Sequence, residues 1–180
     1  LIFFNKQYTM ASFEYAFALI EILEGGYSEN PGEGGGETYV GISRNAHPGW
    51  AGWHYIDEWE CENGTPTYSF LWPELEINVK EFYRNNSWDA IWGDQFADQA
   101  IASYFFDWFL DSGEAAVDEL KRVLKISPDT ENFGPVMIQT INEMTNGFLA
   151  DLHQCLLQFY KNCTDENPLI RKFLKGRLVR

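Results

Sequence analysis

The sequence is short of cysteine and of basic residues, and each shortage argues against a class of protein. Its 180 residues include 3 cysteines, an odd and small number that does not fit a fold held together by disulfides. Lysine and arginine total 13 against 27 acidic residues, which gives a formal net charge of −14. Because nucleic acids and anionic membrane surfaces are bound by basic faces, we expect neither as a partner.

Long apolar runs are also missing. No stretch reaches the roughly 18 apolar residues that a membrane-spanning helix needs, so we expect no membrane span. Residues 1–9 lack both the basic start and the full apolar stretch of a secretory signal peptide. We therefore interpret 1–9 as an extension outside the fold, and we expect synthesis in the cytoplasm without a recognisable signal peptide.

Apolar and aromatic residues are abundant, at 45% and 17% of the chain. This composition is enough to build one sizeable core. Apolar residues at helical spacing, with capping residues or prolines at several starts, predict a mainly α fold. The predicted helices cover residues 12–24, 73–86, 98–110, 114–125, 135–144, 147–163 and 168–180. Residues 38–43 predict one short β element, whereas 44–67 show no clear period and are predicted to be irregular.

Glu24 carries the first catalytic hypothesis. It continues the apolar face of Phe17 and Ile20 at the end of the first predicted helix. Burial and the negative end of the helix dipole both favour the protonated carboxyl over the carboxylate. A general acid needs a carboxyl that keeps its proton near neutral pH. The alternative interpretation is a helix-ending Glu that turns to solvent.

A second carboxylate, Glu33, follows in a glycine-rich segment that could face Glu24 across a cleft. Glycoside hydrolysis needs such a pair, because one group protonates the leaving oxygen while the other activates water or attacks the sugar. A solvated acidic loop is the alternative. A Ca²⁺ loop is disfavoured, because the alternating aspartates and distal Glu of such loops are missing.

The same residues form a pattern. The sequence resembles the signature of glycoside hydrolase family 108 at Glu24-Gly25-Gly26-Tyr27, Asn30-Pro31, Gly35-Gly36, Thr38 and Gly41-Ile42-Ser43. Further similar positions are Tyr83-Arg84, Trp88-Asp89, Phe106-Asp107 and Ser112-Gly113. Gly134-Pro135 and the end with Phe173, Gly176 and Arg180 resemble the peptidoglycan-binding region that accompanies the family. The family consists of lysozyme-like N-acetylmuramidases, some of which are described as secretion activators.

The resemblance implies a lysozyme-like helical domain with a small β-hairpin beside the catalytic loop. Residues 10–94 would form the catalytic part, and 95–180 a helical peptidoglycan-binding part packed on the same core. The implied activity is hydrolysis of β-1,4 glycosidic bonds in peptidoglycan glycan strands, without cofactor or metal. It would take place at the cell wall or periplasm, after release or export.

The resemblance also implies roles for single residues. Glu24 would be the catalytic acid, and Glu33 would activate water with help from the Thr38 hydroxyl, similar to the Glu…Asp…Thr triad of phage-type lysozymes. The substrate-binding candidates are Tyr27, Asn30, Tyr39, Tyr83 and Trp88.

Two positions depart from the family pattern. Glu33 stands where the family usually has Asp, and Tyr39 stands where Asn is common. Because a longer side chain moves the carboxylate, Glu37 is a second candidate for the water-activating group. The departure at Glu33 also leaves an alternative function open, that of a non-catalytic peptidoglycan-binding or secretion-accessory module with the same fold.

Other groupings support other hypotheses. His47, His54 and Cys61, with Asp57 between them, supply donor types for a zinc amidase or peptidase, although no pair has the close spacing of a structural zinc site. Cys61 and His153 could form a nucleophile pair only through tertiary contact.

Indole faces with a polar N–H suit stacking on sugars. Among the tryptophans we expect Trp50, Trp53 and Trp88 to line a cleft, and Trp72, Trp92 and Trp108 to be buried.

Overall fold

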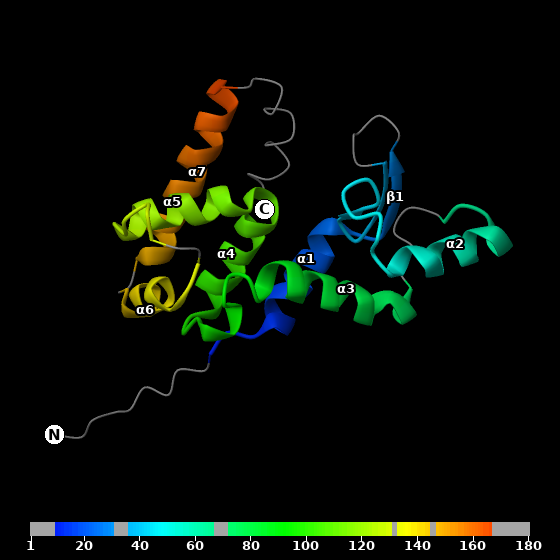
Figure 1. Ribbon diagram of the computed structural model, residues 1–180, viewed down its shortest axis with the longest axis horizontal. Coiled ribbons are helices and arrows are strands. Elements are labelled where there is room, and N and C mark those ends of the chain that lie inside the picture. The colour runs from blue at the N-terminus through cyan, green and yellow to red at the C-terminus, as the bar shows by residue number, and fades with distance from the viewer. Residues whose placement is uncertain (1–9, 31–35, 67–71, 131–132, 145–146, 167–180) are drawn as a thin grey trace. The chain divides into compact units, whose positions relative to one another are not determined.

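The chain divides into two compact units. The computed structural model describes residues 10–30, 36–66, 72–130, 133–144 and 147–166 (Figure 1). One unit is Phe17–Asn86, and the other consists of the described residues within Leu1–Ala16 and Ser87–Arg180. The predicted extension 1–9 and the predicted helix 168–180 lie outside the described residues. The predicted division into functional parts 10–94 and 95–180 stays a prediction.

The described chain is mainly helical with one small antiparallel sheet, which confirms the predicted fold class. The unit 17–86 contains most of helix α1 and the whole sheet, whose strand order is β1-β2-β3. Its elements are α1 (Phe13–Glu24), β1 (Tyr27–Asn30), β2 (Gly36–Tyr39), β3 (Ile42–Ser43), α2 (Gly52–Asn63), η1 (Pro73–Leu75) and α3 (Glu76–Tyr83). A π-helical turn, η2 (Arg84–Trp88), continues α3 across the boundary between the units.

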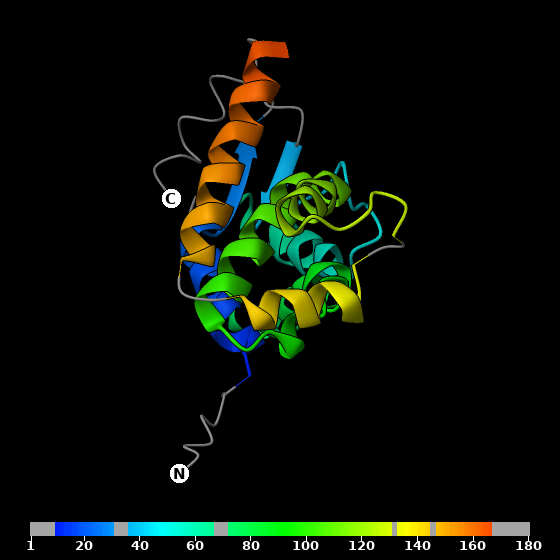
Figure 2. The same ribbon diagram turned by 90° about the vertical axis from the view of Figure 1, so that its left-hand side faces the viewer.

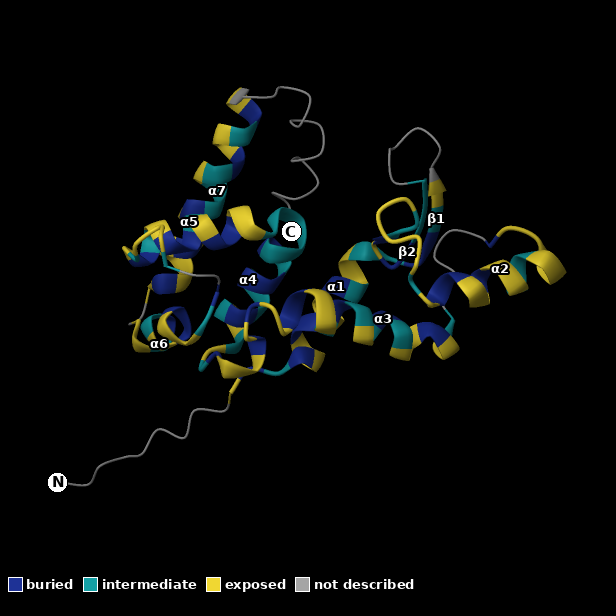
Figure 3. Ribbon diagram, in the orientation of Figure 1, coloured by how far each residue is buried: buried dark blue, intermediate teal, exposed yellow. Residues whose placement is uncertain are grey.

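Two predictions for this unit need correction. The single β element predicted at 38–43 is divided into β2 and β3 by a turn at Val40 and Gly41. The prediction that 44–67 is irregular is wrong, because α2 lies within it. Helix α2 buries only Gly52, Trp53 and Ile56. Buried and exposed residues therefore alternate along the helix, and its apolar stripe is narrow (Figure 3). Such a narrow stripe does not produce a visible helical period in the sequence.

The second unit is a group of helices around α5. Its elements are η3 (Gly93–Gln95), α4 (Gln99–Ser112), α5 (Glu114–Leu124), α6 (Pro135–Glu143) and α7 (Phe148–Glu166). Helix α5 packs against α4, α6 and α7, and α6 lies across the N-terminal end of α7 (Figures 1 and 2). None of the helices in the described part of the chain is long and apolar enough to cross a membrane.

Trp88 lies at the centre of a cluster of buried aromatic rings in this unit. Its side chain is fully buried and meets Phe13 and Phe106 edge to face, with ring centroids 5.8 and 5.4 Å apart. Its indole N–H donates to Asp94 Oδ1 at 2.8 Å, which satisfies the one polar atom of the ring. The predicted role of Trp88 as a wall of a substrate cleft is therefore wrong, since a ring without exposed surface cannot stack on a sugar.

The helix boundaries follow local chemistry that the sequence displays. Asp98 precedes α4 in extended conformation, and its carboxylate accepts the backbone N–H groups of Ala100 and Ile101 at 2.8 and 3.0 Å. Gly113 ends α4 at a φ of 53°, a conformation that costs little only for glycine. Pro135 occupies the first turn of α6, where its missing N–H loses no bond.

The cap at Asp98 gives a test of this account. We expect Asp98→Ala to lower the free energy of unfolding by about 0.5–2 kcal/mol, because two N–H groups at the start of α4 lose their acceptor. Asp98→Asn keeps an acceptor oxygen and should unfold close to wild type. The measurement is chemical denaturation followed by circular dichroism. An Ala variant with an unchanged midpoint would show that the cap contributes nothing.

Candidate active site

Glu24 is the last residue of α1 and is half-buried, on the same helix face as the buried Phe17 and Ile20. The next residue, Gly25, takes a φ of 71° and donates its N–H to the carbonyl of Glu21 at 3.2 Å. This left-handed step ends the helix in the way that glycine allows at low cost. It leaves the Glu24 side chain at the junction between α1 and the sheet.

The turn between β2 and β3 consists of two residues with positive φ, Val40 at 44° and Gly41 at 75°. Two-residue hairpins of type I′ require positive φ at both positions. A β-branched residue rarely adopts that conformation, and the strain is about 1–3 kcal/mol. Burial of the Val40 side chain offsets this cost. So does a 2.7 Å hydrogen bond from the Tyr83 hydroxyl to the Val40 carbonyl.

Gly41 brings the turn into close contact with the candidate acid. A methyl group on Gly41 would lie 2.6 Å from the Tyr83 hydroxyl oxygen and 3.0 Å from Glu24 Oε2. Both distances are shorter than van der Waals contact. The carboxyl of Glu24 and the hydroxyl of Tyr83 therefore border the same small space over the turn. Phe17 packs on the Tyr83 ring at 5.6 Å and links α1 to α3.

The sheet has one packed face and one hydroxyl-bearing face. The pairing sets Ser28 opposite Thr38 and Thr38 opposite Ser43, so these three side chains share a face. All three are half-buried. The Thr38 hydroxyl donates to the Gly36 carbonyl at 3.4 Å. The hydroxyl-bearing face therefore presents polar groups near Gly36, where β2 begins. Glu33 precedes Gly36 in the sequence and lies outside the described residues.

Glu37 alternates to the opposite face, where Arg44 holds it. Arg44 Nε lies 2.5 Å from Glu37 Oε2, and the same guanidinium donates to both carboxylate oxygens of Asp57 in α2, at 3.2 and 2.6 Å. The Arg44 side chain also lies over the Trp53 ring, 4.6 Å from its centroid. Burial raises the pKa of Glu37 and the charges of Glu60 and Asp57 add to this, against the opposing effect of Arg44.

The three tyrosines predicted to bind substrate are core residues instead. Tyr27 is 2%, Tyr39 1% and Tyr83 5% exposed. Their hydroxyls are engaged within the unit: Tyr27 donates to Glu60 Oε1 at 3.1 Å, and Tyr39 accepts the backbone N–H of Trp72 at 2.8 Å. Burial raises the pKa of Tyr27, with the charges of Glu37 and Glu60 adding to it. Their burial argues against the predicted substrate-binding role of these three tyrosines.

The tryptophan predictions were partly wrong. Trp108 is buried as expected, but Trp53 is also buried and Trp92 is 43% exposed. Trp50 is half-buried and stacks on Tyr39, with centroids 6.1 Å apart. Asn30 pairs with Gly36 at the end of β1, and its predicted contact with substrate stays a prediction. Spacing could not sort Trp50, Trp53 and Trp92, because they lie in turns or at the start of a helix, where the period is broken.

The residues proposed for zinc or for a cysteine nucleophile have other neighbours. His47 packs its ring on Phe82, and Asp57 binds Arg44. His54 Nε2 lies 3.3 Å from Glu58 Oε1. Within the described ranges no group of three or more His, Cys, Asp or Glu residues could hold a metal ion. His153 Nδ1 lies 2.7 Å from the Tyr104 hydroxyl, and Cys61 is an exposed free thiol.

Comparisons with known proteins agree with the fold. The sequence model of a family described as Glycosyl hydrolase 108 matches residues 17–113, more than half of the chain. A solved structure described as Brucella abortus SagA superposes with a TM-score of 0.64 at 22% sequence identity, over 93% of this chain and 90% of that chain. At that identity the likeness shows the fold. A comparison with curated protein sequences gave no match.

The contact at Gly41 can be tested against a matched glycine. We expect Gly41→Ala to destabilise the fold and to displace the Glu24 carboxyl, because the new methyl group meets Tyr83 and Glu24. Gly64→Ala is the control, since Gly64 also has a positive φ, 80°, but nothing within 4 Å of its added methyl group. Thermal unfolding of the two variants measures the difference. Equal losses in both would mean that backbone strain alone matters and that Glu24 does not pack on the turn.

Proposed function

The chain belongs to the glycosyl hydrolase 108 family, and from that premise we propose that it is a lysozyme-like N-acetylmuramidase that cleaves β-1,4 bonds in peptidoglycan. Family membership implies a glycoside hydrolase acting on peptidoglycan. The finer assignment depends on one observation, the packing of the half-buried Glu24 carboxyl against the Val40–Gly41 turn beside the Tyr83 hydroxyl. A carboxyl held on a rigid turn can be presented to a glycosidic oxygen without further ordering.

Glu24 is the proposed general acid, and it protonates the oxygen of the leaving sugar as the glycosidic bond breaks. Positive charge then develops at the anomeric carbon, which a water molecule attacks. Three features support this role: the position of Glu24 at the end of α1, its partial burial, and the tight turn that fixes its surroundings. No metal or cofactor is needed for this chemistry.

Glu33 is the proposed base that takes a proton from the attacking water, with the Thr38 hydroxyl orienting that water. Glu33 follows β1 in the sequence, and Thr38 lies on the hydroxyl-bearing face of β2. The rival candidate, Glu37, lies on the opposite face, in an ion pair with Arg44. This pairing favours Glu33 as the base and gives Glu37 the structural role of joining β2 to Arg44 and, through it, to α2.

The proposed partner is the glycan strand of peptidoglycan, and the proposed place of action is the cell wall or periplasm after release or export. The acidic chain, at −14, offers little general attraction for anionic polymers. Binding must therefore come from local contacts to sugars, through hydroxyl, amide and indole groups.

A non-catalytic wall-binding or secretion-accessory module is the second candidate. The observation that favours it is the Glu at position 33, where the family usually has Asp. Such a module would bind peptidoglycan with the same fold and leave the glycan intact. Product analysis separates the two functions, because only a muramidase releases new reducing ends on muramic acid.

The acid role predicts the effect of one substitution. We expect Glu24→Gln to fold like wild type and to lose activity by a factor on the order of 10²–10⁴, since an amide of similar shape cannot donate the proton. New reducing ends released from purified peptidoglycan measure the rate. Glu14→Gln, at an exposed position in the first turn of the same helix, is the charge-matched control. Wild-type turnover by the Glu24→Gln variant would remove Glu24 from the mechanism.

The second carboxylate generates a separate prediction. We expect Glu33→Ala to lose on the order of 10²-fold in rate and Glu33→Asp to keep most of it, because Asp places the same group on a shorter side chain. If Glu33 activates water directly, its carboxyl should lie roughly 6.5–9.5 Å from that of Glu24 and the product should be the inverted anomer. Proton NMR of the fresh product reads the anomer.

Glu37→Ala is the comparison for this test. It should lower stability through loss of the Arg44 ion pair while leaving the rate of folded protein near wild type. A large loss of rate in Glu37→Ala with full activity in Glu33→Ala would move the base to Glu37. Full activity in both would exclude the two-carboxylate mechanism.

A further inference from the structure

Helix α1 exposes a row of apolar side chains opposite its buried face. Tyr15 is 72%, Leu19 53%, Ile22 79% and Leu23 39% exposed, and Ala18 between them is exposed as well. Residues that are three, four, seven or eight positions apart lie on one side of a helix, so these side chains form a continuous row. We call Tyr15, Ala18, Leu19, Ile22 and Leu23 the α1 stripe.

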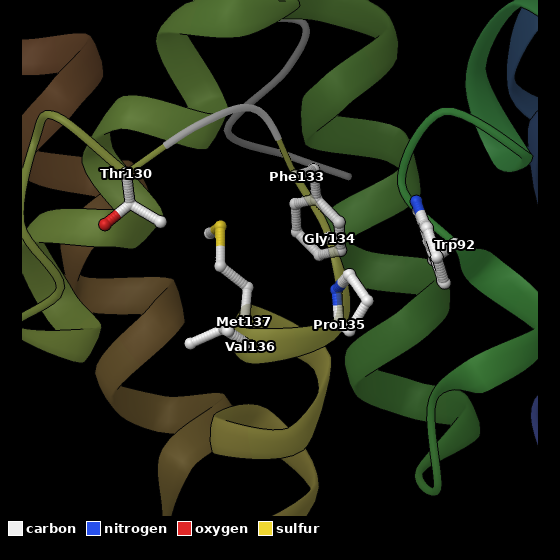
Figure 4. Close-up of a pocket in the computed structure, with 7 residues that line it drawn as sticks. All are labelled: Trp92, Thr130, Phe133, Gly134, Pro135, Val136 and Met137. Atoms are coloured by element: carbon white, nitrogen blue, oxygen red, sulfur yellow. The ribbon is translucent and has the colours of Figure 1, made fainter.

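No other helix in the described part of the chain exposes apolar side chains in this way. Each exposes at most one that is large, such as Ile77 in α3, which is 69% exposed. Trp92 and Val136 are also exposed, but they line a cavity of about 570 Å³ together with the buried Phe133 and Met137 (Figure 4). Isolated exposed apolar residues are normal on a protein surface, whereas a continuous row indicates a surface that another element covers.

The composition of α1 suits a helix that is covered on more than one side. The face opposite the α1 stripe is buried through Phe13, Phe17 and Ile20. Three glutamates are the only charged residues in the helix. A helix that is apolar nearly all round is typical of one enclosed by its protein, whereas a surface helix carries a charged face. The described residues therefore leave one apolar side of α1 uncovered.

The chain itself supplies a matching segment. Residues 168–180 follow α7 and lie outside the described residues. Their sequence predicts a helix with an apolar side made of Ile170, Phe173, Leu174 and Leu178. At 1.5 Å per residue such a helix would be roughly 20 Å long, which is enough to cover the roughly 12 Å of the α1 stripe.

Charge favours this segment over other occupants of the α1 stripe. Residues 168–180 contain five basic and no acidic residues, although the whole chain carries −14. Glu14 and Glu21 are seven positions apart and lie along one border of the α1 stripe. Basic side chains of a docked segment meet these carboxylates, whereas a second copy of α1 would bring like charges together.

We propose that residues 168–180 pack as a helix on the α1 stripe, with their apolar side against it and their basic residues beside Glu14 and Glu21. This contact lies within one chain and does not depend on the proposed activity. It encloses from both sides the helix that ends at Glu24. The position of that carboxyl then depends on a segment at the other end of the sequence.

Isoleucine methyl signals in the NMR spectrum of the full chain test the contact directly. Ile22 and Ile77 are matched probes, because they are 79% and 69% exposed and only Ile22 belongs to the α1 stripe. Each δ1-methyl signal is identified by its loss when that Ile is changed to Val. We expect Phe173→Ala to shift the Ile22 signal, since the phenyl ring no longer lies near it, and to leave the Ile77 signal in place. An Ile22 signal that does not respond to Phe173→Ala overturns the proposal.

A double-mutant cycle measures whether the two sites stabilise the fold through each other. We expect Ile22→Ala to lower the melting temperature by at least about 4 °C, as for a buried side chain. Phe173→Ala should lower it too, and the two together by clearly less than the sum of the single losses. Ile77→Ala is the control, which should change the melting temperature little and add to the effect of Phe173→Ala.

The outcomes identify what covers the α1 stripe. Coupled losses in a chain that sediments as a monomer support the proposal. Coupled losses only in a dimer, whose melting temperature rises with protein concentration, would assign the cover to a second copy and overturn it. Additive losses, or an Ile22→Ala variant as stable as Ile77→Ala, overturn it as well. None of these measurements uses bond cleavage, so their result stands whether or not Glu24 is the catalytic acid.

Discussion

The strained turn at Val40 and Gly41 is the constraint on which the candidate site depends. Two positive φ angles set the hairpin between β2 and β3, and the Tyr83 hydroxyl fixes the turn through the Val40 carbonyl. The absence of a side chain on Gly41 then lets the Glu24 carboxyl approach the turn. Strain of about 1–3 kcal/mol at Val40 is tolerated because burial and a hydrogen bond offset it.

The sheet gives its two faces different roles around this local constraint. Tyr27, Tyr39 and Glu37 lie on the packed face and contact residues of α2 and its neighbourhood, whereas Ser28, Thr38 and Ser43 share the other face. Arg44 stabilises the packed face by binding Glu37 and Asp57 together. In the proposed mechanism the hydroxyl-bearing face is then the one that meets water and substrate. The aromatic residues on the packed face are buried and serve as core residues.

The sequence predicted the helices where local signals are strong. Asp98, Gly113 and Pro135 mark helix ends through capping, positive φ and a missing N–H, and the structure places helix boundaries next to all three. The helix α2 escaped prediction because its buried stripe consists of little more than Trp53 and Ile56. The burial predicted for Trp92 and the cleft position predicted for Trp88 were both wrong. Trp92 lies in a turn with positive φ and is exposed, whereas Trp88 ends a π-helical turn and packs on Phe13 and Phe106.

By itself, the sequence determined the mainly helical class, the position of Glu24 at a helix end, and the glycine-rich pattern that resembles the family. These are local properties, set by caps, spacing and backbone freedom over a few residues. Only the tertiary structure decided that Tyr83 supports the Val40–Gly41 turn, that Glu37 is bound to Arg44, and that Trp92 is exposed beside a cavity. Each of these depends on a partner outside its own segment of the chain, and periodicity in one segment carries no information about such a partner.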